Sequence, residues 1–132
     1  MDKLSIGELA KQARVNKETI RYYERKGLIP EPPRNDSGHR QYSEIDVKRT
    51  EFIKRTQSLG FSLKEIKDLL TLKIQPHTTC KDIQEIAKFK ISDIDKKIAD
   101  LMLIKKTLSK LADRCNGMGP VSDCPILDEL EK

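Results

Sequence analysis

Apolar residues recur at helical spacing in four segments of the first 75 residues of this 132-residue chain. Each segment follows a residue or pair of residues that can cap a helix: Ser5 with Glu8, Asn16, Ser43 with Asp46, and Ser62 with Glu65. Gly27 and Gly60 suit the left-handed residue that follows a helix. The pattern predicts one helix over about residues 5–13, a second from 17 to Gly27, a third from 43 to Gly60, and a fourth from 62 to the stop before Pro76.

The first two predicted helices are joined by the short connection Arg14-Val15, which is typical of a helix-turn-helix unit. Within the second helix, Ile20 and Tyr23 are expected to pack inward. Residues 28–42 contain three prolines and one glycine, so a helix is excluded there, and the sequence NDSG can close a short β-hairpin. A hairpin after a helix-turn-helix unit is a wing, and the alternative is a loose linker.

A second region begins after Pro76. From Lys81 to about Asp113 the chain has neither proline nor glycine, and one set of apolar residues is spaced alternately by three and four. This heptad stripe consists of Ala87, Ile91, Ile94, Ile98, Leu101, Leu108 and Ala112. Lys105 interrupts it, while Ile104 and Leu111 widen the apolar face. The stripe predicts a long helix that pairs with a second copy in a coiled coil, the alternative being burial against its own domain.

The predicted organisation has four parts: a DNA-binding domain over residues 1–75, a linker over 76–80, a dimerisation helix over 81–113, and a C-terminal loop with a short helix over 114–132. The fold class is therefore mainly α. Apolar residues make up 36% of the chain and charged residues another 36%. No apolar run approaches the roughly 20 residues needed to cross a bilayer. The N-terminus lacks the apolar core of a secretory signal, so we expect a cytoplasmic protein.

The net charge of +5 lies in one half of the chain. Residues 1–75 carry 16 Lys and Arg against 11 Asp and Glu, whereas residues 76–132 carry 10 of each. A basic module suits double-stranded DNA, although a solvated basic surface is the plainer alternative. The second predicted helix and the wing supply cationic and hydroxyl donors for phosphates and groove edges. The candidate DNA contacts are Lys17, Thr19, Arg21, Tyr22, Arg25, Arg34, His39, Arg40, Tyr42 and Arg55.

Three cysteines, Cys80, Cys115 and Cys124, are candidate metal ligands. Cys80 is expected just before the long helix and Cys115 just after it, so the rise of a helix separates them by about 50 Å in one chain. Two such helices packed antiparallel would bring Cys80 of one chain beside Cys115 and Cys124 of the other. Three thiolates favour a soft metal, and a reducing compartment favours thiolates over a structural disulfide. Three inert buried cysteines are the alternative.

The residues also resemble a known family. Ile20-Arg21-Tyr22-Tyr23-Glu24 with Gly27-Leu28, then Arg40-Gln41-Tyr42, then Leu59-Gly60-Phe61 are landmarks of the MerR family of bacterial transcriptional regulators, and the likeness spans nearly the whole chain. The resemblance implies a winged-helix DNA-binding domain, an antiparallel coiled-coil homodimer and a C-terminal effector region. It also implies that the dimer represses a promoter, then untwists the DNA for RNA polymerase when the effector binds.

Within the family the three cysteines are similar to those of the mercuric-ion sensors, which implies Hg(II) as effector. Copper and silver sensors lack a cysteine that corresponds to Cys80, and zinc sensors usually have a second cysteine where this chain has Asn116. Lead and cadmium sensors are also similar, so Pb(II) or Cd(II) is an alternative, with His77 as a possible nitrogen ligand.

Two other function classes are alternatives. A thiol redox sensor on the same scaffold is one, although iron-sulfur members of the family cluster four cysteines where this chain has two. A metal-dependent enzyme is the weakest, because neither His39 nor His77 has a catalytic spacing and no glycine-rich phosphate loop follows a strand. We therefore expect no enzyme activity and no organic cofactor.

Overall fold

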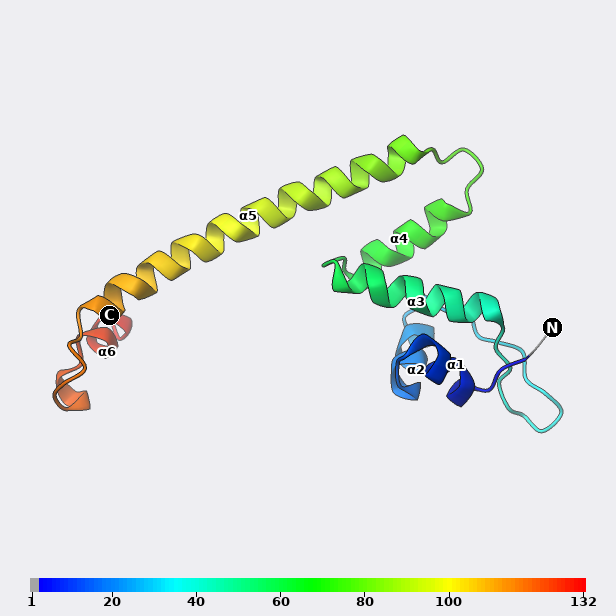
Figure 1. The fold of residues 1–132 in the computed structure, drawn as a ribbon, viewed down its shortest axis with the longest axis horizontal. Coiled ribbons are helices and arrows are strands. Elements are labelled where there is room, and N and C mark those ends of the chain that lie inside the picture. The colour runs from blue at the N-terminus through cyan, green and yellow to red at the C-terminus, as the bar shows by residue number, and fades with distance from the viewer. Residues whose placement is uncertain (1–2) are drawn as a thin grey trace. The chain divides into compact units, whose positions relative to one another are not determined.

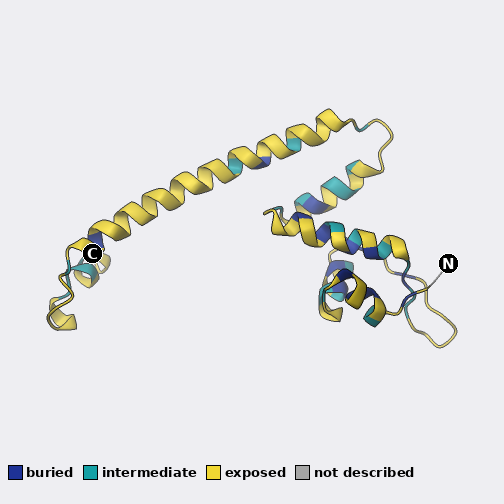
Figure 2. Cartoon of the chain, viewed as in Figure 1, coloured by how far each residue is buried: buried dark blue, intermediate teal, exposed yellow. Residues whose placement is uncertain are grey.

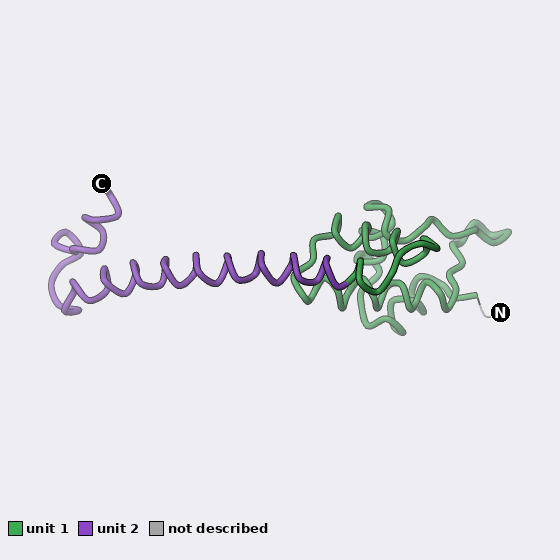
Figure 3. The backbone as a smooth tube through the Cα atoms, turned by 90° about the horizontal axis from the view of Figure 1, so that it is seen from above, with its two compact units in different colours: residues 1–83 green, residues 84–132 purple. Residues whose placement is uncertain are grey.

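The chain is almost entirely helical in the computed structural model, which describes residues 3–132 (Figure 1). The elements are α1 (Ile6–Ala13), α2 (Lys17–Arg25), α3 (Glu44–Ser58), α4 (Leu63–Lys73), α5 (Cys80–Asp113), the 3-10 turn η1 (Val121–Asp123) and α6 (Pro125–Leu130). Contacts divide the chain into two units, one ending at residue 83 and the other beginning at residue 84 (Figure 3).

Local capping sets the starts of the helices in the first unit. The Ser5 hydroxyl accepts a hydrogen bond from the Glu8 amide at 3.1 Å, and the Glu8 carboxylate accepts one from the Ser5 amide at 2.9 Å. The same reciprocal arrangement joins Ser62 and Glu65, and Ser43 is paired with Asp46. These bonds satisfy amides that have no partner inside the helix, so the predicted starts of α1, α3 and α4 are confirmed.

The core of the first unit lies among α1, α2, α3 and α4. Its fully buried side chains come from all four helices and from the segments between them: Leu9, Ile20, Ile29, Tyr42, Ile53 and Ile66. Tyr23 is also buried, and its hydroxyl donates a hydrogen bond to Gln57 Oε1 at 2.9 Å. The predicted inward orientation of Ile20 and Tyr23 is therefore confirmed, and their burial fixes which face of α2 is left for solvent or a ligand.

Residues 28–42, the wing loop, return on themselves without forming strands. Arg34 and Arg40 form one isolated antiparallel bridge, and Leu4 and Tyr42 form another; no strand is assigned between residues 3 and 132. The β-hairpin form of the predicted wing is therefore not confirmed. Pro30, Pro32 and Pro33 lack amide hydrogens, which prevents a longer ladder on that side.

Helix α5 begins one residue earlier than predicted. The Thr79 amide donates to Asp82 Oδ2 at 2.9 Å, and the Asp82 amide donates to Thr79 Oγ1 at 3.3 Å. This capping pair makes Cys80 the first residue of the helix rather than the last residue of a linker. The prediction that Cys80 precedes the helix is corrected accordingly.

The apolar stripe of α5 lies on the surface of the chain (Figure 2). All seven residues of the predicted stripe, from Ala87 to Ala112, are exposed. Its isoleucines and leucines at 91, 94, 98, 101 and 108 are between 37% and 64% exposed.

None of the helices in the described residues combines the length and the hydropathy needed to span a membrane.

Candidate nucleic-acid interface and cysteine loop

The outward face of α2 carries the first group of predicted DNA contacts. Asn16 caps the helix, because its Oδ1 accepts hydrogen bonds from the Thr19 amide and the Thr19 hydroxyl, both at 2.8 Å. The Thr19 hydroxyl therefore holds the turn and keeps lone pairs free to accept from a ligand. Lys17 is exposed. With its donors outward and its N-terminus capped, α2 has the composition of a helix that reads a groove.

Tyr22 forms the aromatic centre of the exposed face of α2. The guanidinium carbon of Arg25 lies 5.8 Å from the centre of its ring, and Lys26 Nζ lies 5.7 Å from it. These cation–π contacts hold two cations beside the partly exposed ring, and the ring does not neutralise their charge. Arg25 and Tyr22 are thus displayed as the sequence predicted, while Lys26 is a neighbour that the prediction left out.

The predicted contacts Arg21, Arg34, His39 and Arg40 come together around one cavity of about 290 Å³. This wing pocket is lined by Ser5, Ile6, Arg21, Arg34, Gly38, His39 and Arg40. Arg21 is paired with Glu18 on the same helix, and Arg34 Nη1 donates to the Gly38 carbonyl at 2.8 Å, which closes the loop tip. Three guanidinium groups from α2 and the wing loop therefore converge, an arrangement suited to an anion such as a phosphate.

Glu24 is the functional residue that the sequence reasoning named only as a family landmark. Its side chain is 8% exposed, and its two oxygens accept hydrogen bonds from Arg40 Nη1 at 2.9 Å and from the Tyr42 hydroxyl. A buried carboxylate with a charged and a neutral donor holds both in fixed positions. Glu24 therefore orients Arg40 toward the wing pocket.

Tyr42 does not lie on the surface. Its side chain is 1% exposed, and burial, followed by the hydrogen bond to Glu24, raises the pKa of the phenol to about 12. The prediction that Tyr42 contacts DNA is corrected: a side chain closed off from solvent cannot reach a phosphate or a base edge. Its role is to pack the core and complete the hydrogen bonds of Glu24.

Arg55 lies on α3, apart from the wing pocket. It is exposed, and it lines a separate cavity together with Arg14 and Lys54. The predicted DNA contacts therefore fall into two groups within the first unit, one at the wing loop and one beside the turn between α1 and α2.

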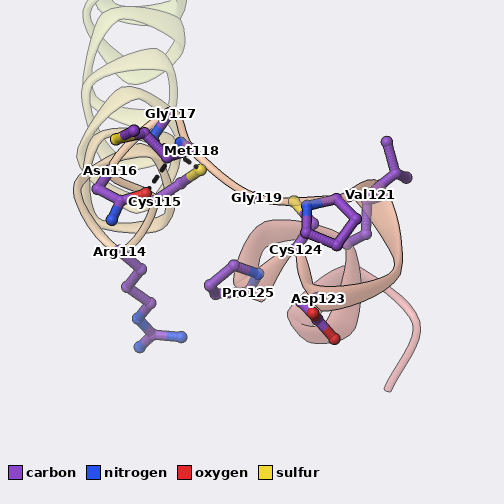
Figure 4. Close-up of a pocket in the computed structure, with 12 residues that line it drawn as sticks. Arg114, Cys115, Asn116, Gly117, Met118, Gly119, Val121, Asp123, Cys124 and Pro125 are labelled. Atoms are coloured by element: carbon purple, nitrogen blue, oxygen red, sulfur yellow. Dashed lines mark hydrogen bonds between the residues drawn. The ribbon is translucent and has the colours of Figure 1, made fainter.

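Two of the three candidate metal ligands share a loop. Cys115 and Cys124 both line a pocket of about 460 Å³ formed by residues 114–127. Figure 4 shows both cysteines among the lining residues, Cys115 just after the end of α5 and Cys124 just before α6. The Gly117 amide donates a hydrogen bond to Cys115 Sγ at 3.4 Å. Gly117 and Gly119 have φ values of 78° and 102°, a conformation that glycine adopts without strain.

The base of this loop is held by an ion pair. Arg114 Nη1 lies 3.3 Å from Glu129 Oε2, which joins the end of α5 to α6. Hydrogen bonding to Lys132, with a smaller contribution from Arg114, lowers the pKa of Glu129. Asn116 Oδ1 accepts a hydrogen bond from the Met118 amide at 2.9 Å, which fixes the side chain at the start of the loop.

Cys80 is the first residue of α5 and is not among the residues that line this loop pocket. It is exposed and lines a mainly apolar cavity of about 300 Å³ with side chains of α3 and α4, among them Phe52, Leu69 and Leu72. Among residues 3–132 no cluster of three or more histidine, cysteine, aspartate or glutamate side chains could hold a metal ion. His77, the alternative nitrogen ligand, is exposed.

Comparison with known proteins finds two family models and several relatives that match this chain. A model of MerR HTH family regulatory proteins matches residues 4–73, and a model described as MerR, DNA binding, matches residues 47–111. A mercuric resistance operon regulatory protein of Bacillus cereus is 48% identical over 98% of each chain.

Two solved structures are similar over almost the whole length. MerR from Bacillus megaterium MB1 in complex with mercury(II) is 44% identical, with a TM-score of 0.72, and covers 98% of this chain and all of its own. The lead(II) complex of PbrR691 from Ralstonia metallidurans CH34 is 32% identical, with a TM-score of 0.86, and covers 96% of this chain and 98% of its own.

Proposed function

Because this chain belongs to the MerR family of helix-turn-helix regulatory proteins, we propose that it is a DNA-binding transcription regulator that responds to Hg(II). In this proposal a homodimer holds the ion through three thiolates, with Cys80 from one protomer and Cys115 and Cys124 from the other. The observation that carries it is that Cys115 and Cys124 share a pocket at one end of a long helix whose other end is Cys80.

The length of α5 is the reason for assigning the ligands to two protomers. A helix of 34 residues is about 50 Å long. Bonds between a thiolate and a metal are about 2.3 Å long for zinc and of the same order for heavier soft ions. One copy of α5 therefore cannot bring its own Cys80 to Cys115, whereas an antiparallel partner presents its Cys80 at that end.

The exposed stripe of α5 supports the pairing. Its branched side chains alternate in steps of three and four and remain accessible along the helix. Burying Ile91, Ile94, Ile98, Leu101 and Leu108 against a second copy would remove them from water and hold the two ends in register.

Three sulfur ligands support a large, soft ion. Zinc prefers four ligands in a tetrahedral arrangement, and Asn116 stands where a fourth thiolate would be needed. The similarity to a mercuric resistance regulator of Bacillus cereus and to the mercury(II) complex of MerR from Bacillus megaterium supports mercury as the ion for this chain. Pb(II), or Cd(II), is the second candidate, since PbrR691 binds lead and has the higher TM-score.

The regulatory step follows from coupling two sites on one dimer. Distorting a DNA site of 20–30 base pairs costs about 1–6 kcal/mol, depending on its sequence. Coupling between distant sites is typically about 1–3 kcal/mol, enough to change the distorted fraction about 5-fold to 150-fold. We propose that the metal-free dimer represses a promoter and that Hg(II) binding untwists it for bacterial RNA polymerase in the cytoplasm.

Mixed dimers test the shared site directly. One chain carries Cys80→Ser and the other carries Cys115→Ser with Cys124→Ser, and the two are co-expressed. Neither variant alone has a complete set of thiolates in a shared site, whereas the mixed dimer restores one of the two sites. We expect Hg(II) binding by the mixed dimer at about half the wild-type stoichiometry, and almost none by either parent. Equal weakness of the mixed dimer and its parents would contradict sharing between protomers.

The effector is tested in a transcription assay with Hg(II), Pb(II), Cd(II) and Zn(II) under reducing conditions. Activation at the lowest concentration by Hg(II) supports the proposal, and activation first by Pb(II) or Cd(II) supports the second candidate. A response to oxidant in place of any metal would support a thiol redox sensor.

A further inference from the structure

Arg14 has a backbone conformation that is unusual for its residue type. Its φ is 59° and its ψ is 44°, and it is the one residue other than glycine with a positive φ between residues 3 and 132. The conformation lets the Arg14 amide donate to the Lys11 carbonyl at 3.3 Å and the Val15 amide donate to the Ala10 carbonyl at 3.0 Å. Glycine would fit this turn without the clash that a Cβ brings, so the fold alone does not call for arginine.

The side chain of Arg14 lines a cavity of about 430 Å³ beside this turn. The cavity, named here the turn pocket, is lined by Gln12, Ala13, Arg14, Glu51, Lys54, Arg55 and Ser58. It contains three cationic side chains and one carboxylate. Lys54 Nζ donates to the Arg14 carbonyl at 2.8 Å, which anchors the turn to α3.

Among residues 3–132, the two guanidinium groups of the turn pocket have no ion-pair partner. In the part of the chain that the structure describes, no carboxylate lies within ion-pair distance of the Arg14 or Arg55 guanidinium. Both side chains are exposed. Two unpaired guanidinium groups in one cavity are suited to bind an anion with several oxygens.

We propose that the turn pocket binds a phosphate of the DNA backbone and that Arg14 is its principal donor, with Arg55 as the second. This inference rests on the DNA-binding part of the proposed function and is independent of the metal. Arg14 lies two residues before Asn16, the N-cap of α2. It is therefore next to the N-terminal end of α2, and in a helix-turn-helix complex the N-terminal residues of this second helix contact the base edges.

The position of the two basic pockets supports DNA over an acidic protein partner. Ser5 and Ile6 at the start of α1 line the wing pocket, whereas Gln12 and Ala13 at its end line the turn pocket. In a helix-turn-helix complex the first helix crosses the DNA backbone. Helix α1 has eight residues and is about 12 Å long, so basic pockets at its two ends would contact separate phosphates.

The test measures the binding of the full-length protein to a mixed-sequence 30-base-pair duplex by fluorescence anisotropy between 50 and 200 mM salt. The variants are Arg14→Gly, Arg14→Lys, Arg55→Gln, and Lys96→Gln as a matched loss of one exposed charge on α5. Each phosphate contact contributes about 0.9 to the slope of log affinity against log salt. For a dimer, Arg14→Gly should lower the slope by about 1.8 and the affinity at 0.1 M salt by up to about 60-fold.

Arg14→Gly separates binding from folding, because the two should move in opposite directions. The thermal unfolding midpoint should be unchanged or higher, since glycine relieves the left-handed backbone, while DNA binding weakens. Arg14→Lys should keep most of the slope, and Lys96→Gln should leave it near the wild-type value. A slope for Arg14→Gly equal to that of the wild type would overturn the proposal.

Two further outcomes keep this inference distinct from metal sensing. Wild-type salt dependence in Arg14→Gly with reduced transcription would mean that the turn pocket faces a protein, which also overturns the proposal. A wild-type protein that binds the duplex and does not respond to Hg(II) would refute the metal proposal alone.

Discussion

Replacing Glu24 should test whether the wing loop is positioned by one buried carboxylate. Glu24→Ala removes the acceptor of two hydrogen bonds, one from Arg40 Nη1 and one from the Tyr42 hydroxyl. The Glu24 side chain is 8% exposed and Tyr42 is 1% exposed, so water cannot readily replace the carboxylate. The variant leaves a buried hydroxyl without a partner, and the Arg40 guanidinium keeps only the longer ion pair with Glu31, at 3.9 Å.

The size of the effect follows from those two losses. A hydrogen bond to a charged group contributes about 1.5–3 kcal/mol, and a buried polar group left without a partner costs about 1–3 kcal/mol. Because 30% of the Arg40 side chain remains exposed to water, the loss of its hydrogen bond to Glu24 should cost an amount near the lower limit of the first range. We expect Glu24→Ala to lower the free energy of unfolding by about 3 kcal/mol and Tyr42→Phe to lower it by about 1 kcal/mol.

Urea unfolding at pH 7 and a fixed protomer concentration measures both variants and their combination. The double variant should cost less than the sum of the single ones by about 1 kcal/mol, because a phenylalanine ring in place of the tyrosine leaves no unpaired hydroxyl. A cost below about 1 kcal/mol for Glu24→Ala, or strict additivity with Tyr42→Phe, would refute the reasoning. Lys48→Gln on α3, an exposed cation outside this network, serves as the control.

Three further predictions concern pairing, pH and capping. Ile98 has about half of its surface left to bury, so Ile98→Ala should cost about 1 kcal/mol per copy and raise the dimer dissociation constant about 30-fold in sedimentation equilibrium; an unchanged constant would exclude Ile98 from the interface. The phenol of Tyr42 keeps its proton up to a pKa of about 12, whereas an unfolded tyrosine ionises near 10. The contribution of Tyr42 to the free energy of unfolding should therefore be fully present below pH 10 and be lost between pH 10 and 12. The Tyr42→Phe variant should lose less stability over that range. Ser62→Ala removes the cap of α4 and should lower the free energy of unfolding by about 1 kcal/mol, with Ser62→Asp as the variant that restores it.

The long-range contacts of the wing could not be predicted from the sequence. Glu24 and Tyr42 are 18 positions apart, and Glu24 and Arg40 are 16 apart, so no local pattern links them. The sequence therefore placed Tyr42 among the DNA contacts, whereas packing of α2 against the wing loop buries it. The same limit applies to the turn pocket, which joins Arg14 to Lys54 across 40 positions.

The sequence by itself determined the helices, because a cap acts over three residues and an apolar face repeats every three or four. The starts of α1, α3 and α4 and the inward faces of Ile20 and Tyr23 were correct for that reason, and the pair Thr79 and Asp82 would have placed the start of α5 as well. Only the tertiary structure decided which polar side chains are buried and which cations converge on one cavity. Those outcomes depend on contacts between distant segments, whose energies arise from desolvation and pairing in the folded chain and leave no periodic trace in its sequence.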